Sequence, residues 1–209
     1  MKPPKIPAAT ITRLSIYSRA LEELVDEQVP VVSSKRLAEL CGVNPAQIRK
    51  DLAYFGQFGV RGVGYYVKEL IFDIRKILGL HKEWFLAIVG MGNLGCALVA
   101  HENFLKQGYR FVCSFDVDPM KVGHRLATGL EIHHLDQLER VCREAGAEIG
   151  VICTPPEHAQ EVANRMIEVP LKGLLNFAPV QIHCPQGFKV ENVDFTVKLD
   201  NLAYHLTST

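Results

Sequence analysis

Apolar residues near the start of the chain recur every three or four positions, as on one face of an α-helix. The positions are Ile11, Leu14, Tyr17, Leu21 and Leu24. They predict a helix over about residues 10–27, closed by Pro30. Ser33 and Ser34 offer an N-cap to a short second helix, and Gly42 offers its left-handed end.

A third helix is predicted directly after this turn. Asn44 is suited to cap it, Pro45 takes its first position, and Gln47 is placed to bond back to the cap. Its outward face carries Gln47, Arg49, Lys50, Ala53 and Tyr54. Long donors on a helix held by two short helices suit the major groove of DNA. Asp51 is unsuited to phosphate, so we expect it to orient Arg49 or to form a salt bridge within the protein.

Glycines interrupt β-forming residues over positions 56–67. This composition predicts a tight two-stranded ribbon with Arg61 near its tip. A basic ribbon after a recognition helix is the wing of a winged helix, which contacts phosphates or the minor groove. A compact three-helix domain that docks protein is the alternative. Residues 68–80 then predict a connecting helix that ends at Gly79.

The pattern changes at residues 84–89, a continuous apolar run typical of a buried parallel strand. A helix expected from Ala97 follows after a glycine-rich loop. The loop residues are Gly90, Met91, Gly92, Asn93, Leu94 and Gly95. A strand, a G-x-G-x-x-G turn and a helix together predict a dinucleotide site, in which the pyrophosphate meets the N–H groups at the helix start.

A second strand over residues 109–115 ends in Asp116, about 20 residues beyond the last glycine. A carboxylate at this position bonds both hydroxyls of the adenosine ribose and repels a 2′-phosphate, so NADH and NAD+ are the expected ligands. Lys121 and Arg125 leave open a 3′-phosphorylated ligand such as coenzyme A. A Rossmann-like domain that has lost its ligand is the remaining alternative.

Further strands alternate with helices up to residue 179. Strands are expected at 130–132, 147–153 and 173–175, and helices at 135–145 and 156–168. Thr154 and Pro155 end one of these strands, beside the crevice expected to hold the cofactor. Phe177, Ala178 and Pro179 are candidates for an apolar wall near the nicotinamide, which would disfavour its cationic oxidised form. Ordinary core packing is an equal alternative for these three residues.

The tail over residues 194–209 predicts one helix with an apolar stripe. The stripe consists of Phe195, Leu199, Leu202 and Leu206. Because such a stripe needs a partner and winged-helix proteins commonly bind two-fold sites, a homodimer is expected. The predicted fold class is α/β. It comprises a winged helix-turn-helix domain (1–80), a Rossmann-type dinucleotide-binding domain (81–193) and a C-terminal helix (194–209).

The formal net charge of zero conceals an asymmetry, since residues 1–80 carry +4 and the remainder −4. A basic first half suits double-stranded DNA as a partner. Six widely spaced cysteines form no pattern of zinc ligands, so no metal is expected. Neither a signal peptide nor an apolar run of about 18 residues is present, so we expect a cytoplasmic protein without membrane contact.

Residues 49–56, continuing through 58–59 to 61–65, resemble the recognition helix and wing of the Rex family of redox-sensing transcriptional repressors. The likeness extends through the glycine loop, Phe115-Asp116, residues 176–179 and residues 192–194. The resemblance implies a bacterial homodimer that represses genes of fermentative or anaerobic respiratory metabolism from a palindromic operator. It also implies that NADH binding lowers operator affinity, that NAD+ competes for the pocket, and that the C-terminal helix is exchanged between subunits.

The DNA-contact candidates are Lys35, Gln47, Arg49, Lys50, Tyr54 and Arg61. The resemblance makes Arg49, Lys50 and Tyr54 contacts of the recognition helix and Arg61 the contact of the wing. It also makes Arg19 and Asp194 partners in an interdomain switch. His101 stands where members often carry a tyrosine near the nicotinamide, so an aromatic contact is not carried over. A pH-sensitive contact by His101 is a hypothesis, and a surface position is its alternative.

An enzyme that transfers hydride is the competing function. His133, His134 and His158 are candidates for a proton relay, but each is more simply explained as a surface residue. The sequence therefore favours a regulator that is not an enzyme.

Overall fold

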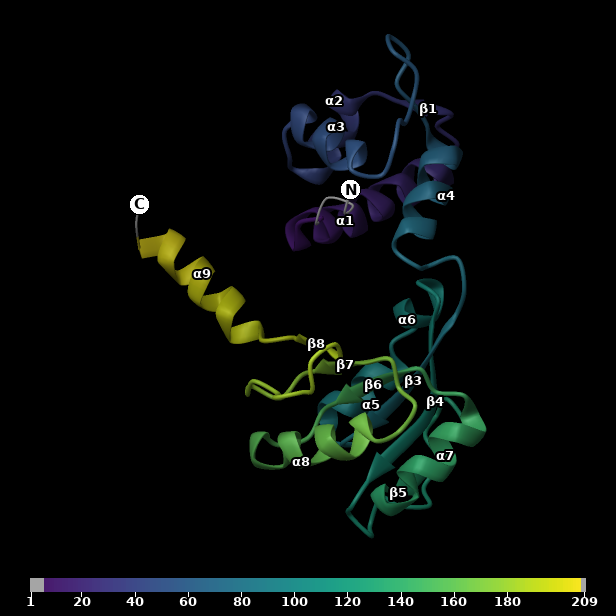
Figure 1. The fold of residues 1–209 in the computed structure, drawn as a ribbon, viewed down its shortest axis with the longest axis vertical. Coiled ribbons are helices and arrows are strands. Elements are labelled where there is room, and N and C mark those ends of the chain that lie inside the picture. The colour runs from purple at the N-terminus through teal and green to yellow at the C-terminus, as the bar shows by residue number, and fades with distance from the viewer. Residues whose placement is uncertain (1–5, 208–209) are drawn as a thin grey trace. The chain divides into compact units, whose positions relative to one another are not determined.

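The computed structural model describes residues 6–207. The chain forms two compact units, one extending to Lys82 and the other beginning at Glu83 (Figure 1). The first unit contains α1 (Ala8–Asp26), α2 (Ser34–Cys41), α3 (Pro45–Ala53) and α4 (Val67–Ile77). Two short strands, β1 (Val31–Val32) and β2 (Tyr65–Tyr66), pair antiparallel.

The core of the first unit is formed by the apolar faces of its four helices. Its fully buried members include Leu14, Tyr17, Leu21, Leu37, Ile48, Leu52 and Ile74. The helical spacing read from α1 is thereby confirmed, since four of the five predicted apolar positions are buried and only Ile11 is exposed. This core fixes α3 against α1 and leaves the opposite face of α3 in solvent.

The ends of α2 and α3 follow the predicted capping residues. Ser33 Oγ accepts a hydrogen bond from Arg36 N at 3.1 Å, and Gly42 takes the left-handed conformation with φ 64°. Asn44 Oδ1 accepts from Ala46 N at 2.7 Å. The predicted return bond from Gln47 to this cap is wrong, because the Gln47 amide is drawn to the buried carboxylate of Asp51.

The segment after α3 pairs with itself near its tip, but it does not form the full two-stranded ribbon that was predicted. Val60 and Gly64 form an antiparallel bridge that encloses residues 61–63, whereas β2 pairs with β1. Gly64 has φ 119°, and a Cβ there would lie 2.5 Å from Val32 O. Gly64 therefore packs closely onto β1, and Arg61 is exposed between the two bridged residues, at the tip where it was predicted.

The second unit is built on a six-stranded parallel sheet in the order β5-β4-β3-β6-β7-β8 (Figure 1). In chain order the strands are β3 (Trp84–Val89), β4 (Tyr109–Asp116), β5 (Ile132–His134), β6 (Ile149–Ile152), β7 (Gly173–Asn176) and β8 (Lys189–Asn192). This order, in which the first strand lies beside the second and the fourth, is that of the doubly wound dinucleotide-binding fold. The sequence pattern missed β8 and placed β5 two residues too early.

Helices pack on both faces of this sheet. They are α5 (Asn93–Ala100), α6 (Asn103–Lys106), α7 (Leu138–Ala145) and α8 (Pro156–Ile167), with a 3₁₀ turn at Leu135–Gln137. Alternate residues of β3 enter different cores: Ala87 and Val89 join the side chains of α7 and α8, whereas Leu86 and Ile88 join those of α5. The helix expected from Ala97 begins four residues earlier, which places half of the glycine loop inside its first turn.

The last helix, α9 (Phe195–Thr207), carries no buried residue. The ring of Phe195 lies 6.2 Å from that of Phe177, and Asp194 Oδ1 accepts a hydrogen bond from Thr196 N at 2.8 Å. None of the helices in residues 6–207 is long and apolar enough to cross a membrane. The same residues contain no group of three or more acidic, histidine or cysteine side chains able to hold a metal ion.

Candidate functional site

The outward face of α3 presents the predicted basic residues to solvent. Arg49 and Lys50 are exposed, as is Lys35 on α2, and Tyr54 is half-buried at the end of α3. Gln47 differs, because its Nε2 donates to Asp51 Oδ1 at 2.8 Å. The structure therefore gives Gln47 a partner inside the protein, four residues further along α3, a spacing at which helical side chains meet.

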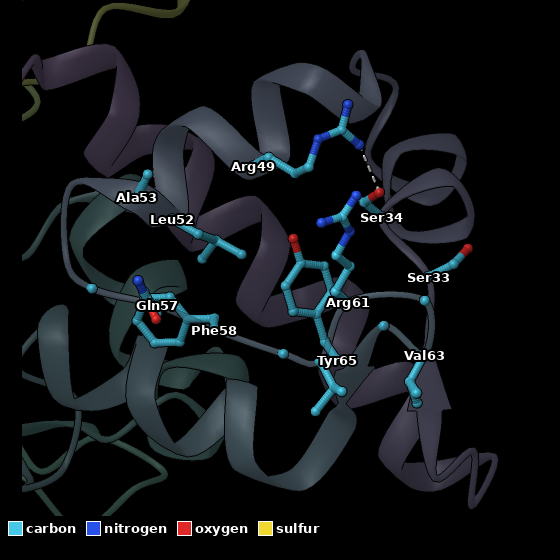
Figure 2. A pocket seen from close by; sticks show the side chains of 15 residues that line it. Ser33, Ser34, Arg49, Leu52, Ala53, Gln57, Phe58, Arg61, Val63 and Tyr65 are labelled. Carbon is cyan, nitrogen blue, oxygen red and sulfur yellow. Dashed lines mark hydrogen bonds between the residues drawn. The ribbon is translucent and has the colours of Figure 1, made fainter.

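A hollow of about 730 Å³ lies between α3 and the turn over residues 56–65 (Figure 2). Arg49 and Arg61 line it together with Ser34 and Tyr65. Arg49 Nη1 donates to Ser34 Oγ at 3.0 Å, the hydrogen bond that Figure 2 marks with a dashed line. Two guanidinium groups at one hollow give a local positive charge suited to phosphate groups.

A buried carboxylate lies on the inner face of α3. Asp51 is fully buried, and its Oδ2 accepts from Arg13 Nε at 2.6 Å and from Tyr17 Oη at 2.8 Å. Its Oδ1 accepts from Arg13 Nη2 at 2.7 Å, Thr10 Oγ1 at 3.1 Å and the Gln47 amide. The salt bridge expected for Asp51 is confirmed with Arg13 as its partner, whereas the alternative of orienting Arg49 is wrong.

The protonation of Asp51 follows from these contacts. Burial on its own would raise its pKa, but the hydrogen bonds, that of Arg13 foremost, lower the pKa to about 2. Burial and the bond to Asp51 raise the pKa of Tyr17. Asp51 is therefore a carboxylate and Tyr17 a phenol at neutral pH. This charged cluster joins the inner face of α3 to α1.

The glycine loop of the second unit has the geometry of an anion cradle. Gly90 has φ 97°, and a Cβ there would lie 2.7 Å from Cys153 C and O. The first helical bond of α5 runs from Cys96 N to Gly92 O, so the N–H groups of residues 93–95 precede it and have no helical acceptor. A Cβ on Gly92 would meet no atom within 4 Å, whereas one on Gly95 would lie 2.1 Å from Gly90 O. The first and third glycines serve close packing, and the second borders open space.

Asp116 stands at the end of β4, beside this loop. Its Oδ2 accepts from Met91 N at 2.8 Å and from Lys121 Nζ at 3.1 Å. Its Oδ1 accepts from Val117 N at 2.8 Å and Asp118 N at 2.9 Å. Burial alone would raise the pKa of Asp116, but these hydrogen bonds lower it, so the group is a carboxylate.

Loop and carboxylate border one cleft of about 720 Å³, within the range of nucleotide-sized pockets. The predicted residues that line it are Gly90, Gly92, Asn93, Leu94, Asp116, Thr154 and Pro155. The Thr154 hydroxyl is buried and has no hydrogen-bond partner among the described residues. An unpaired buried hydroxyl is unfavourable, so a ligand that bonds it would be stabilised.

Five of the predicted cofactor residues do not line the cleft. Met91 is 2% exposed with its side chain in the core, so it contributes only its backbone, and Gly95 packs on Gly90. Phe177, Ala178 and Pro179 also lie outside the lining, and Ala178 is buried in the core. For Ala178 the alternative of ordinary packing therefore holds.

The sequence reasoning missed one wall of the cleft. Leu135 and one face of α8 line it, the latter with His158, Glu161, Val162 and Arg165. Arg165 Nη2 bonds Leu135 O at 2.9 Å and Asp136 Oδ1 at 3.0 Å. These α8 residues stand at positions i, i+3, i+4 and i+7, the spacing of one helix face, so helical spacing counted from Pro155 would have identified them.

Within the second unit, His101 and Asp194, two of the residues assigned to the switch, are not among those that line the cleft. His101 is exposed at the end of α5, where its Nδ1 accepts from Asn103 N at 3.2 Å and its ring contacts Phe104. It borders a different hollow, lined also by Tyr109 and Thr128. Arg19 is exposed on α1, and the bonds from Thr196 lower the pKa of Asp194. For His101 a surface position is thus confirmed within this chain.

Two family models match the chain. Residues 5–53 match “Putative DNA-binding protein N-terminus”, and residues 81–180 match “CoA binding domain”. The redox-sensing transcriptional repressor Rex of Syntrophobacter fumaroxidans is 61% identical over 207 residues, covering 99% of each chain. The repressor of the same name from Streptomyces griseus subsp. griseus is 44% identical, with 96% of this chain and 79% of that protein covered.

Solved structures give the same likeness over both units. The crystal structure of RSP in complex with β-NAD+ and operator DNA superposes with a TM-score of 0.91 at 36% identity, covering 97% of this chain and 93% of that one. The complex of RSP with β-NADH superposes with a TM-score of 0.88 at 34% identity, covering 98% and 95%.

Proposed function

This chain belongs to the Rex family of redox-sensing transcriptional repressors, and we propose that it holds operator DNA through its first unit and NADH or NAD+ through its second. One observation carries this proposal. A basic helix face beside an arginine-lined hollow, and a nucleotide-sized cleft with a glycine cradle, occur in a single chain that matches repressors from end to end.

NADH and NAD+ are regulatory ligands in this protein, which is a repressor and not an enzyme. A ligand shifts a conformational equilibrium only if its affinity differs between the two states, so NADH must bind the DNA-free state more tightly. A preference of about 10⁴-fold would carry the population from 1:99 to 99:1. We further propose that Arg19 and Asp194 take part in this switch, that the regulated genes serve fermentative or anaerobic respiratory metabolism, and that the protein is cytoplasmic.

The proposal is tested by fluorescence anisotropy with an operator duplex obtained by in vitro selection, at constant salt. We expect NADH to raise the apparent Kd of the complex at least about tenfold and NAD+ to leave it unchanged. Coenzyme A serves as a third arm because of the family model that residues 81–180 match. Identical isotherms with and without NADH would contradict the proposed sensing.

The DNA contacts are proposed to come from Lys35, Arg49, Lys50, Tyr54 and Arg61. Replacing Arg49 or Arg61 by alanine should weaken operator binding about tenfold and lower the slope of log Kd against log salt concentration by about 1 if each contacts phosphate. The control is Arg140→Ala on α7, an exposed arginine paired with Glu144. Equal affinities of all three variants would remove Arg49 and Arg61 from the interface.

We propose a homodimer on a palindromic operator, joined in part through α9. The four residues of its apolar stripe are each more than half exposed: Phe195, Leu199, Leu202 and Leu206. Leaving such a stripe in water is unfavourable, and a second copy of the chain offers the matching stripe.

This assignment predicts that Leu199→Asp converts the dimer to a monomer, because a buried unpaired carboxylate opposes association. The measurement is sedimentation equilibrium of the full chain. The matched control is Asn201→Asp, which adds the same charge on the other side of α9. A dimer that survives Leu199→Asp as well as it survives the control would exclude α9 from the interface.

A further inference from the structure

The side chain of Lys121 bonds Asp116, the carboxylate expected to accept from the ribose hydroxyls of a dinucleotide. A carboxylate offers about four acceptor sites, and Asp116 already receives four donors in this structure. Three of these donors are backbone N–H groups of the glycine loop and of the turn after β4. The fourth is the ammonium of Lys121. A ligand hydroxyl that bonds Asp116 must therefore displace one of the four.

Lys121 is the donor that can leave. Its side chain is 38% exposed, whereas the Asp116 side chain is 9% exposed. Asp118 offers the Lys121 ammonium a second acceptor, since Asp118 Oδ2 lies 3.7 Å from Lys121 Nζ. Moving the three backbone donors would instead require the loop or the end of β4 to change shape. A released ammonium held by Asp118 stays beside Asp116, close to where the hydroxyl binds.

The charge of Lys121 has opposite consequences for two kinds of dinucleotide. A ligand with free ribose hydroxyls needs the carboxylate as an acceptor. A ligand with a 2′-phosphate is repelled by Asp116 but attracted by an ammonium a few ångströms away. Lys121 thus reduces the net negative charge that a 2′-phosphate meets.

Resting on the function proposed above, we propose that Lys121 determines how strongly the cleft discriminates NAD(H) from its 2′-phosphorylated counterpart. Its ammonium bonds Asp116, gives way to the ribose hydroxyls of NADH, and reduces the repulsion that excludes NADPH. Asp116 makes the cleft prefer NADH to NADPH, and Lys121 determines how large that difference in affinity is.

The test measures the dissociation constants of NADH and NADPH by the fluorescence of the nicotinamide, for the full chain. The ratio of the two constants cancels any effect of Lys121 on the pyrophosphate, which both ligands share. We expect Lys121→Met to raise the NADPH/NADH ratio at least about tenfold over the wild type, through loss of NADPH affinity. Lys121→Arg retains the charge and should hold the ratio within about threefold of the wild type.

Lys106→Met is the matched control, because it removes an exposed lysine from α6 by the same substitution. It should leave the ratio unchanged, and thermal midpoints should confirm that all variants fold. A ratio that stays within twofold of the wild type in Lys121→Met, or that falls, would overturn the proposal for Lys121. Failure of the wild type to bind NADH at all would instead overturn the proposed function.

Discussion

Replacing Asp51 by asparagine is expected to lower the free energy of unfolding of the first unit by about 3 kcal/mol. The asparagine amide has the same size as the carboxylate but no charge, so the guanidinium of Arg13 loses its counter-ion. The amide nitrogen is itself a donor, and it would face one of the groups that now donate to Asp51. Breaking a buried ion pair costs about 3–5 kcal/mol, and the lower end applies because the Arg13 side chain is 24% exposed. Calorimetric unfolding of the full chain measures the change.

The pH dependence of this difference tests the ionic origin of the effect. The pKa of Asp51 is about 2 in the folded state, against 3.8 ordinarily. Because the folded value is the lower one, the contribution is complete above about pH 4 and is lost as the pH falls towards 2. The stability gap between wild type and Asp51→Asn should therefore close by about 2 kcal/mol over that interval.

The control for both measurements is Asp26→Asn, the same substitution at an exposed position near the end of α1. Its effect should stay within about 0.5 kcal/mol at every pH. Hydrogen exchange of the α3 amides should rise only in the Asp51 variant, since the cluster joins α3 to α1. An Asp51 variant as stable as the control would show that the cluster contributes nothing.

Local chemistry made much of the fold predictable. Ser33, Gly42 and Asn44 mark helix ends through contacts with residues only a few positions away. The strand β3 and the glycine turn that follows it can likewise be recognised from a short stretch of sequence. The prediction failed where the decisive contact is distant in sequence. Gln47 bonds Asp51, four residues further along α3, and Asp51 is itself held by donors that lie 34 to 41 residues away on α1.

The candidate site was predictable to the same extent. Asp116 was found because its spacing from the glycines is fixed by one helix and one strand. The wall formed by α8 was missed, although the spacing of one helix face counted from Pro155 would have identified its residues. The occupation of Asp116 by Lys121 was missed as well, although the two are five residues apart, because a lysine at a turn carries no pattern of its own.

The other large effect concerns Gly92, the one glycine of the loop whose Cβ would enter the open cleft. Its φ of −81° is ordinary for alanine, so Gly92→Ala should fold, with a cost of at most about 1 kcal/mol for a poorer N-cap. The added methyl group would occupy the place where the backbone must approach the pyrophosphate. We therefore expect NADH affinity to fall about 100-fold or more, while operator binding remains and no longer responds to NADH.

Gly95→Ala separates this effect from general damage to the loop. Alanine is the better helix former by about 1 kcal/mol, yet its Cβ would lie 2.1 Å from Gly90 O. That variant should lose stability, seen as a lower thermal midpoint, together with NADH binding. Gly92→Ala should lose binding with nearly unchanged stability, because the methyl group meets only space that the ligand requires. If Gly92→Ala bound NADH as the wild type does, the pyrophosphate would have to lie elsewhere, and the glycine loop would be a packing device alone.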